Sequence, residues 1–268
     1  SDTTSLTSAL VVNTVAGLAA GTSVSDGVAL GAGTYDLSVT GQTNTNYVLA
    51  ANPPVGLLTV NRAAITVAGI ASTTHAYGDA AISTAALTAA TTVSGLVNGD
   101  TLASLTPVYA IRNSGGTTVT DGVTLNAGTY SSNLIGITSN NYVLNSTGAS
   151  GVMTVTPRVL TLSSLVNPGH TYGSNAANTT FTLSATANGD VIAPVFTVTN
   201  AAGRVVTDGP TLGVATYTIT ATGLTASSGL ASNYALAANT STLFAITPAV
   251  LTLGVFDAAT NTTGFRVS

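Results

Sequence analysis

The sequence predicts an all-β chain made of tandem repeats of small β-rich domains arranged end to end. Only 5% of its 268 residues are charged, and Lys and Glu are absent, so the usual charged helix formers are missing. Thr, Val, Ser, Gly and Asn are abundant instead, which favours strands and tight turns. One order of short motifs also returns along the chain at intervals of about 90 residues, a common domain size.

The repeated motifs keep their order in each copy, which chance does not readily produce. Asp-Gly pairs occur in Val24-Ser25-Asp26-Gly27, Val119-Thr120-Asp121-Gly122 and Val206-Thr207-Asp208-Gly209. Tyrosine motifs follow them, at Gly33-Thr34-Tyr35, Gly128-Thr129-Tyr130 and Ala215-Thr216-Tyr217, and then at Asn46-Tyr47, Asn141-Tyr142 and Asn233-Tyr234. Two copies carry His75-Ala76-Tyr77-Gly78-Asp79 and His170-Thr171-Tyr172-Gly173-Ser174, and later Asn98-Gly99-Asp100 and Asn188-Gly189-Asp190. These landmarks indicate one repeated domain.

The phase of the motifs divides the chain into four segments. Residues 1–61 are predicted to be the C-terminal part of one repeat, and 62–156 and 157–247 two complete repeats. Residues 248–268 begin a further repeat or donate a strand to a neighbouring chain. No Gly/Ser-rich spacer separates the repeats, so we predict short, semi-rigid joints.

Within the repeats, apolar and polar residues alternate with the period of a half-buried strand. Tyr217 and Ile219 share one predicted inner face, while the threonines between them take the other. The same pattern predicts inward pairs at Met153/Val155, Leu160/Leu162, Phe244/Ile246 and Leu251/Leu253. The inner face changes from odd to even positions across Thr156-Pro157, as expected where a strand leaves one core and enters the next. Asp-Gly and Asn-Gly pairs predict tight turns with left-handed residues.

At these residues the sequence resembles the MBG repeat domains of the Tyr-Gly-x type. These domains occur in large bacterial surface exoproteins related to filamentous haemagglutinins and biofilm adhesins. The resemblance rests on the motifs Tyr77-Gly78-Asp79, Tyr172-Gly173-Ser174, Asn98-Gly99-Asp100, Asn188-Gly189-Asp190, Gly128-Thr129-Tyr130 and Ile246-Thr247-Pro248. It implies a secreted, repeated module with a β-grasp-like or Ig-like sandwich fold. Departures from the pattern are Ser174 in place of Asp, Ala215 in place of Gly, and Asn61-Arg62 in place of Thr-Pro.

Composition argues against several classes of site. Without cysteine the chain has no disulfide, thiol nucleophile or Cys-based metal site, and without lysine it has no Lys–Asn isopeptide bond. A net charge of −4 with scattered arginines offers no basic face for phosphates, so we predict no nucleic-acid partner. Ser, Thr or Gly interrupts every apolar run, so we predict no membrane span.

The polar residues that recur have two readings. His75 and His170 could form a repeated metal or acid/base site with Asp79, but Ser174 takes that place in the second copy, which favours a structural role beside the Tyr-Gly turn. The repeated acids could bind calcium, but as neighbours of glycine they are more simply turn residues that bond their own backbone. These acids are Asp26, Asp100, Asp121, Asp190 and Asp208. We therefore predict no catalytic, cofactor or metal residues.

Tyrosines and sequons are read in the same way. A sugar-stacking surface is one reading of the repeated tyrosines, but strand tyrosines more often bury the ring and bond through the hydroxyl at the core edge. They are Tyr35, Tyr47, Tyr130, Tyr142, Tyr217 and Tyr234. Asn-x-Ser/Thr sequons occur at Asn145, Asn178, Asn239 and Asn261, as expected by chance from a chain so rich in Asn, Ser and Thr.

The function expected from these observations is structural. We predict a stalk in an extracellular bacterial adhesin or biofilm-matrix exoprotein at the cell surface, with no enzymatic activity and no cofactor. Its partners would be neighbouring repeats or like chains, with extracellular polysaccharide or a host or cell surface as further candidates. The alternative is a self-assembling filament in which residues 248–268 complete the partial unit 1–61 of the next chain. A carbohydrate-binding module is a third possibility, supported only by the tyrosines.

Overall fold

A computed structural model describes residues 8–14, 23–24, 27–42, 56–145 and 149–251, and these are mostly β-strand, as predicted. The chain divides into two compact units. Unit 1 comprises Ser1–His75, Ala81–Asp121 and Gly128–Thr154, and unit 2 comprises Ala76–Ala80, Gly122–Ala127 and Val155–Ser268. Unit 2 thus includes two loops, 76–80 and 122–127, whose sequence lies in the predicted repeat 62–156. In the described part of the chain, no helix has the length and hydropathy needed to cross a membrane.

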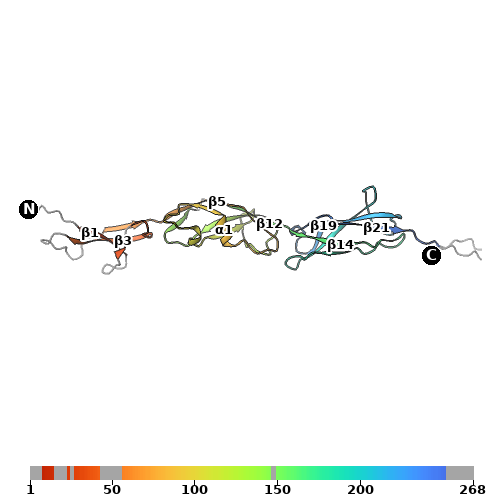
Figure 1. The fold of residues 1–268 in the computed structure, drawn as a ribbon, viewed down its shortest axis with the longest axis horizontal. Coiled ribbons are helices and arrows are strands. Elements are labelled where there is room, and N and C mark those ends of the chain that lie inside the picture. The colour runs from red at the N-terminus through yellow and green to blue at the C-terminus, as the bar shows by residue number, and fades with distance from the viewer. Residues whose placement is uncertain (1–7, 15–22, 25–26, 43–55, 146–148, 252–268) are drawn as a thin grey trace, which may run out of the picture. The chain divides into compact units, whose positions relative to one another are not determined.

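Unit 1 begins with a four-stranded antiparallel sheet, which lies within the predicted partial repeat. Its strands are β1 (Ser8–Thr14), β2 (Ser23–Val24), β3 (Gly33–Gln42) and β4 (Gly56–Val60), in the order β2-β1-β3-β4. Figure 1 shows β1 and β3 in this part of the chain. The motif Gly33-Thr34-Tyr35 lies at the start of β3.

The rest of unit 1 has two sheets around a shared core. One contains β6 (Thr73–Ala76), β12 (Gly151–Thr156), β10 (Gly128–Gly136), β8 (Val108–Arg112) and β9 (Thr118–Val119), in this order. The other contains β11 (Tyr142–Asn145), β5 (Ala63–Ile70) and β7 (Thr91–Ser94). Val67 and Ile70 of β5 pack with Leu134 of β10 and with Leu102 of the 3-10 helix η1 (Leu102–Leu105). This two-sheet core corresponds to the sandwich form of the predicted fold.

A short helix, α1 (Thr84–Ala90), lies in unit 1 between β6 and β7 and has no counterpart in the sequence-based expectation. Ser83 caps it, because its side-chain oxygen accepts the Ala86 N–H at 3.1 Å. Alanines fill most of its length, and Leu87 is its buried residue. The Ser cap followed by an alanine-rich run is a local helix signal that the overall strand composition obscures.

Unit 2 contains a five-stranded sheet of the same strand order as that of unit 1. Its strands are β15 (His170–Thr171), β21 (Ser241–Thr247), β19 (Ala215–Ser228), β17 (Val191–Thr199) and β18 (Val205–Val206). Two smaller pairs join β13 (Arg158–Leu160) to β20 (Tyr234–Leu236) and β14 (Leu162–Val166) to β16 (Thr180–Leu183). The 3-10 helix η2 (Ala231–Asn233) precedes β20, and Figure 1 shows the antiparallel pair β19 and β21.

The alternation of buried and exposed residues is mostly as predicted. Tyr217 and Ile219 are buried and pack with Phe244 and Ile246 in the core of unit 2. The predicted inward pairs Met153/Val155 and Leu160/Leu162 are also buried, so the face change across Thr156-Pro157 is confirmed. The prediction for Leu251 is wrong, because its side chain is 60% exposed, and Leu253 lies outside the described residues.

The two kinds of Gly-containing pair form different turns. Asn98 and Gly99 have φ of 59° and 77°, Asn188 and Gly189 have 55° and 75°, and these are the left-handed turns predicted. The prediction fails for the Asp-Gly pairs, since neither Asp121 nor Asp208 has a positive φ. Their turns start one residue later, where the Leu125 N–H donates to Gly122 O and the Leu212 N–H to Gly209 O, both at 3.0 Å.

Candidate functional site: the Asn-Gly-Asp sockets

In unit 2 the Asn-Gly-Asp turn at 188–190 lies against the start of β20. The Tyr234 hydroxyl donates to Asp190 Oδ2 at 2.8 Å and accepts the Ala187 N–H at 3.0 Å. Burial, together with the hydrogen bond to the Asp190 carboxylate, raises the pKa of Tyr234 to about 12. Tyr234 therefore fixes the turn beside Asn233, and we call residues 187–190 with 233–234 the unit 2 socket.

The loop 122–127 occupies this socket through its main chain. Asn188 Nδ2 donates to the Val123 carbonyl at 2.7 Å, and Asn233 Oδ1 accepts the Ala127 N–H at 2.8 Å. Asn233 Nδ2 also donates to Asn126 Oδ1 at 2.9 Å, and the Asn233 side chain is buried. Two asparagines thus hydrogen-bond a main-chain carbonyl and a main-chain N–H of the loop. Every residue except proline has both of these groups.

The Tyr-Gly turn at 76–80 lies in the same socket. The Tyr77 hydroxyl donates to Asp190 Oδ2 at 3.0 Å, and its ring meets Tyr234 edge to face, with centroids 5.5 Å apart and planes at 80°. Gly78, at φ +88°, leaves no room for a Cβ, because that atom would collide with the Cβ of Ala187. An ion pair of 3.6 Å between Arg158 Nη1 and Asp79 Oδ1 lies at the edge.

Unit 1 contains an equivalent socket at the matching sequence positions. Asn98 Nδ2 donates to the Val28 carbonyl at 2.5 Å, and Asn141 Oδ1 accepts the Ala32 N–H at 2.9 Å. Tyr142 donates to Asp100 Oδ2 at 2.7 Å, and this hydrogen bond raises its pKa. We call residues 97–100 with 141–142 the unit 1 socket, and it holds the loop 27–32 as the unit 2 socket holds 122–127.

The two histidines form equivalent pairs with aspartates from distant positions. His75 Nε2 lies 2.9 Å from Asp121 Oδ1 in unit 1, and His170 Nε2 lies 2.8 Å from Asp208 Oδ1 in unit 2. The partner of His75 is therefore Asp121 rather than the Asp79 considered from the sequence. The hydrogen bond to Asp208 raises the pKa of His170. Each pair joins the strand before a Tyr-Gly turn to the start of an Asp-Gly loop.

The aspartates are engaged individually and not as ligand clusters. Asp121 accepts the Ile82 N–H at 2.8 Å as well as His75, so the expectation that it bonds only its own turn is wrong. Asp79 does bond its own turn, through the Ala76 N–H at 3.3 Å. Within the described ranges no three His or Asp side chains gather in a way that could hold a metal ion. Asp26 lies outside those ranges.

Three of the repeated tyrosines have their rings in the core. Tyr142, Tyr217 and Tyr234 are buried. The Tyr35 and Tyr217 hydroxyls donate to the carbonyls of Gly31 and Gly213, four residues earlier, at 2.7 and 2.8 Å. This is the core-edge role favoured from the sequence, and Tyr47 lies outside the described residues.

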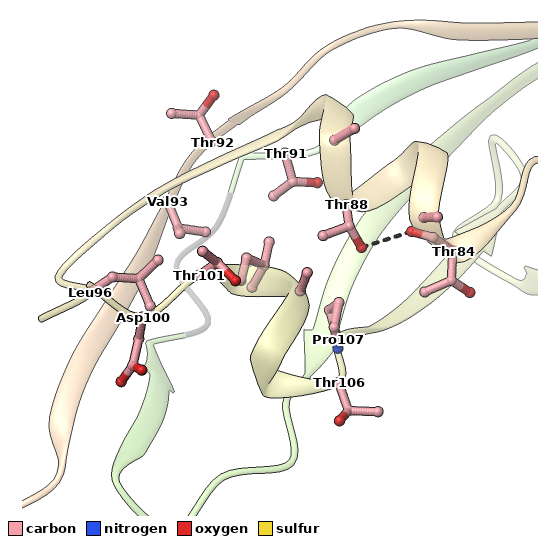
Figure 2. Close-up of a pocket in the computed structure, with 14 residues that line it drawn as sticks. Thr84, Thr88, Thr91, Thr92, Val93, Leu96, Asp100, Thr101, Thr106 and Pro107 are labelled. Carbon is pink, nitrogen blue, oxygen red and sulfur yellow. Dashed lines mark hydrogen bonds between the residues drawn. The ribbon is translucent and has the colours of Figure 1, made fainter. Parts of the chain in front are cut away.

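An open groove of about 790 Å³ lies in unit 1 between α1, β7 and η1 (Figure 2). Two of its hydroxyl groups are bonded within the protein, since Thr88 donates to the Thr84 carbonyl and Thr91 to the Leu87 carbonyl, both at 2.7 Å. Its one carboxylate, Asp100, accepts from Tyr142. The rest of the lining is mostly threonine, alanine and aliphatic side chains, which identify no ligand.

The sequence reading placed the Asn-Gly-Asp and Asn-Tyr motifs as landmarks but missed that their side chains act together. Asn141 and Asn233 in particular make contacts with distant loops that the amino-acid composition of the chain does not suggest. The available signal was the return of Asn directly before Tyr in each copy, including Asn46. A surface residue without a specific hydrogen-bond partner would not have to be asparagine at the position before tyrosine in every copy.

Comparison with known protein families finds a match for part of the chain. Residues 65–154 match the family model described as MBG domain (YGX type). No curated protein matches the chain significantly. The matched segment contains Tyr77-Gly78-Asp79 and the whole unit 1 socket. MBG domains are typical of surface proteins. Residues 65–154 are therefore an MBG domain of the YGX type.

Proposed function

We propose that the chain is the structural repeat region, or stalk, of a secreted bacterial adhesin or biofilm-matrix exoprotein. In this role it projects a binding surface from the cell and supports cell–cell or cell–matrix adhesion. The observation that carries the proposal is the recurrence of the socket. Asn98 and Asn141 hold loop 27–32 with the same atoms by which Asn188 and Asn233 hold loop 122–127.

This recurrence supports a chain of linked modules, because each socket binds a loop from the preceding predicted repeat. Nearest-neighbour contacts of this kind are how repeat proteins gain length, with each repeat stabilised by the next. The five-stranded sheets of the two units also share their strand order, β6-β12-β10-β8-β9 in one and β15-β21-β19-β17-β18 in the other. Similar modules with similar contacts suit a function of spacing and load-bearing.

The proposal includes the absence of catalysis and a location outside the cell or on its surface. Its partners are neighbouring repeats or like chains, and the adhesin's target is extracellular polysaccharide or a host or cell surface. The His–Asp pairs support a structural role for the acids, because the side chains are 5–13% exposed and already bonded to each other. Nucleic acid is not among the proposed partners, since the net charge is −4.

Single-molecule stretching of the full chain tests the proposal. Two separate unfolding events are expected from the predicted repeats 62–156 and 157–247, each lengthening the chain by about 300 Å, as about 90 extended residues span. Display of the chain on a bacterial surface, detected with an antibody, is the cellular counterpart. One cooperative event for the whole chain, together with retention inside the cell, would exclude a stalk.

The filament alternative has one structural observation in its favour. Val250 and Leu251, at the start of the segment 248–268, have side chains that are 83% and 60% exposed. Such residues could pair with a neighbouring chain, although residues 252–268 lie outside the described part. Light scattering after size-exclusion chromatography at increasing concentration separates the two: a monomer throughout supports the stalk, and growing assemblies support the filament.

A further inference from the structure

The surface that occupies the unit 2 socket has a second copy, which lies in unit 2 itself. In the filled socket, the occupying surface consists of the Tyr77-Gly78 turn and the loop from Val123 to Ala127. The matching residues one repeat later are the Tyr172-Gly173 turn and the loop from Pro210 to Val214. We call these later residues the unit 2 docking face. The two surfaces have the same construction, since each pairs a His-x-Tyr-Gly strand with an Asp-Gly loop through the His–Asp contact.

The docking face differs from its counterpart in being uncovered. Tyr172 is 47% exposed, whereas Tyr77 is 5% exposed beneath the socket. Val214, at the position of Ala127, is 52% exposed. A Cβ added to Gly173 would meet nothing within 4 Å, although Gly173 has φ of +87°, close to the +88° of the crowded Gly78. The backbone at Gly173 thus has the same conformation as the backbone at Gly78, but no residues cover it as Ala187 covers Gly78.

We infer that the unit 2 docking face binds a further repeat of this type, one that presents an Asn-Gly-Asp turn and an Asn-Tyr pair. The inference deepens the proposed stalk function and rests on it. The side-chain oxygen of the asparagine in the Asn-Tyr pair accepts the Val214 N–H. The side-chain nitrogen of the asparagine in the Asn-Gly-Asp turn donates to the Pro210 carbonyl. That carbonyl already accepts the Gly173 N–H at 3.1 Å and keeps a second lone pair for this bond.

The docking face lacks the ion pair that lies at the edge of the filled socket. At the filled socket, Asp79 faces Arg158, the residue that follows Pro157. At the docking face both charges are replaced, since Ser174 takes the place of Asp79 and Ala249, after Pro248, takes the place of Arg158. The proposed contact therefore depends on the asparagine hydrogen bonds and on the packing around Gly173. A second copy of the present chain is not the occupant, because both of its sockets hold its own loops.

The test extends the chain by inserting, between Pro248 and Ala249, a second copy of residues 158–248, which supplies a free socket. Hydrogen–deuterium exchange is then followed at the Val214 amide. We expect exchange there to be fast in the original chain and slowed about tenfold or more in the extended chain, as a new hydrogen bond protects the amide. Asn188→Ala and Asn233→Ala in the appended copy alone should abolish the slowing.

A Gly173→Ala variant provides the matched control on the other side of the contact. In the extended chain its new Cβ should collide with the appended copy and remove the protection of Val214, while the amide of Ala127 stays protected. Unchanged exchange at Val214 on extension, or slowing that survives both asparagine substitutions, would overturn the inference. Slowing at Val214 in a protein that is never displayed on a cell would keep the docking contact and remove only the stalk.

Discussion

Asn233 holds the loop 122–127 at two points, because its amide both accepts from the Ala127 N–H and donates to Asn126 Oδ1. Its side chain is 1% exposed, so water cannot replace either partner. The corresponding Asn141 is exposed and has Gly31 where Asn233 has Asn126. One side-chain bond is thereby absent in unit 1, and the two sockets differ in strength although they share their plan.

Replacing Asn233 with Ala should lower the free energy of unfolding by about 1–3 kcal/mol, because the half-buried Ala127 N–H loses its acceptor. Urea denaturation followed by circular dichroism measures the change. Asn239→Ala is the control, since that side chain is exposed, and it should have little effect. Equal losses for the two variants would contradict the role given to Asn233.

His170 should make stability depend on pH in a defined direction. Its pKa in the folded chain is raised above the usual value of about 6.5 by the Asp208 carboxylate, so folding favours the protonated ring. This contribution is complete below about pH 6.5 and is lost as the pH rises through the raised pKa. The stability advantage of the unchanged chain over His170→Gln should therefore shrink between pH 5 and pH 9. An advantage that grows with pH would contradict this assignment.

At the residue scale, the sequence identified the participants but not their partners. His75 and Asp121 are 46 positions apart, and Asn233 and Ala127 are 106 apart, so no local spacing reveals either contact. The assignment of Asp121 to its own turn failed because a carboxylate at the foot of a loop had a histidine from another strand within reach. Tyr217, in contrast, was predictable, since its alternation and its bond to Gly213 are both local.

At the scale of elements, the turns at Tyr77-Gly78 and Tyr172-Gly173 form a matched pair. Both glycines have nearly the same positive φ, +88° and +87°, and only the first is covered. The cost of a left-handed backbone is therefore common to both positions. The contact with Ala187 is the difference between them.

Gly78→Ala should destabilise the chain more than Gly173→Ala. Each substitution incurs about 1 kcal/mol or more for an L-residue at positive φ. Gly78→Ala adds about 1–3 kcal/mol of overpacking against Ala187. Thermal unfolding of the two variants side by side measures the difference. Identical melting temperatures would show that loop 76–80 is not held in the socket.

Most strands were predictable from period-two alternation, as in β12 and β19, because each has one buried face. Helix α1 was not, because seven residues are too few to show a helical period and the Ser83 cap is a short signal in a chain rich in serine. The Asp-Gly turns were placed one residue too early, since the aspartate side chain is drawn to histidine and the backbone turn begins at glycine.

At the scale of the whole molecule, the two sockets should respond alike and independently. Asn98→Ala with Asn141→Ala should speed amide exchange in loop 27–32, and Asn188→Ala with Asn233→Ala should do so in loop 122–127. Removing two hydrogen bonds at the unit 1 socket and three at the unit 2 socket predicts an increase of about tenfold to a hundredfold or more. Mass spectrometry of exchanged peptides measures both loops in each variant. Faster exchange in the loop of the unmodified socket would show that the sites are coupled.

Recognition of main-chain atoms has an evolutionary consequence. Val28 and Val123 offer a carbonyl, and Ala32 and Ala127 an amide, so mutations in the loop side chains leave the recognised groups in place. A gene that gains or loses a complete repeat by unequal recombination would still encode loops that fit the sockets. The reason is that any repeat presents the main-chain carbonyl and amide that the asparagines of its new neighbour bind. Chain length could then change between generations without a compensating mutation in the loops.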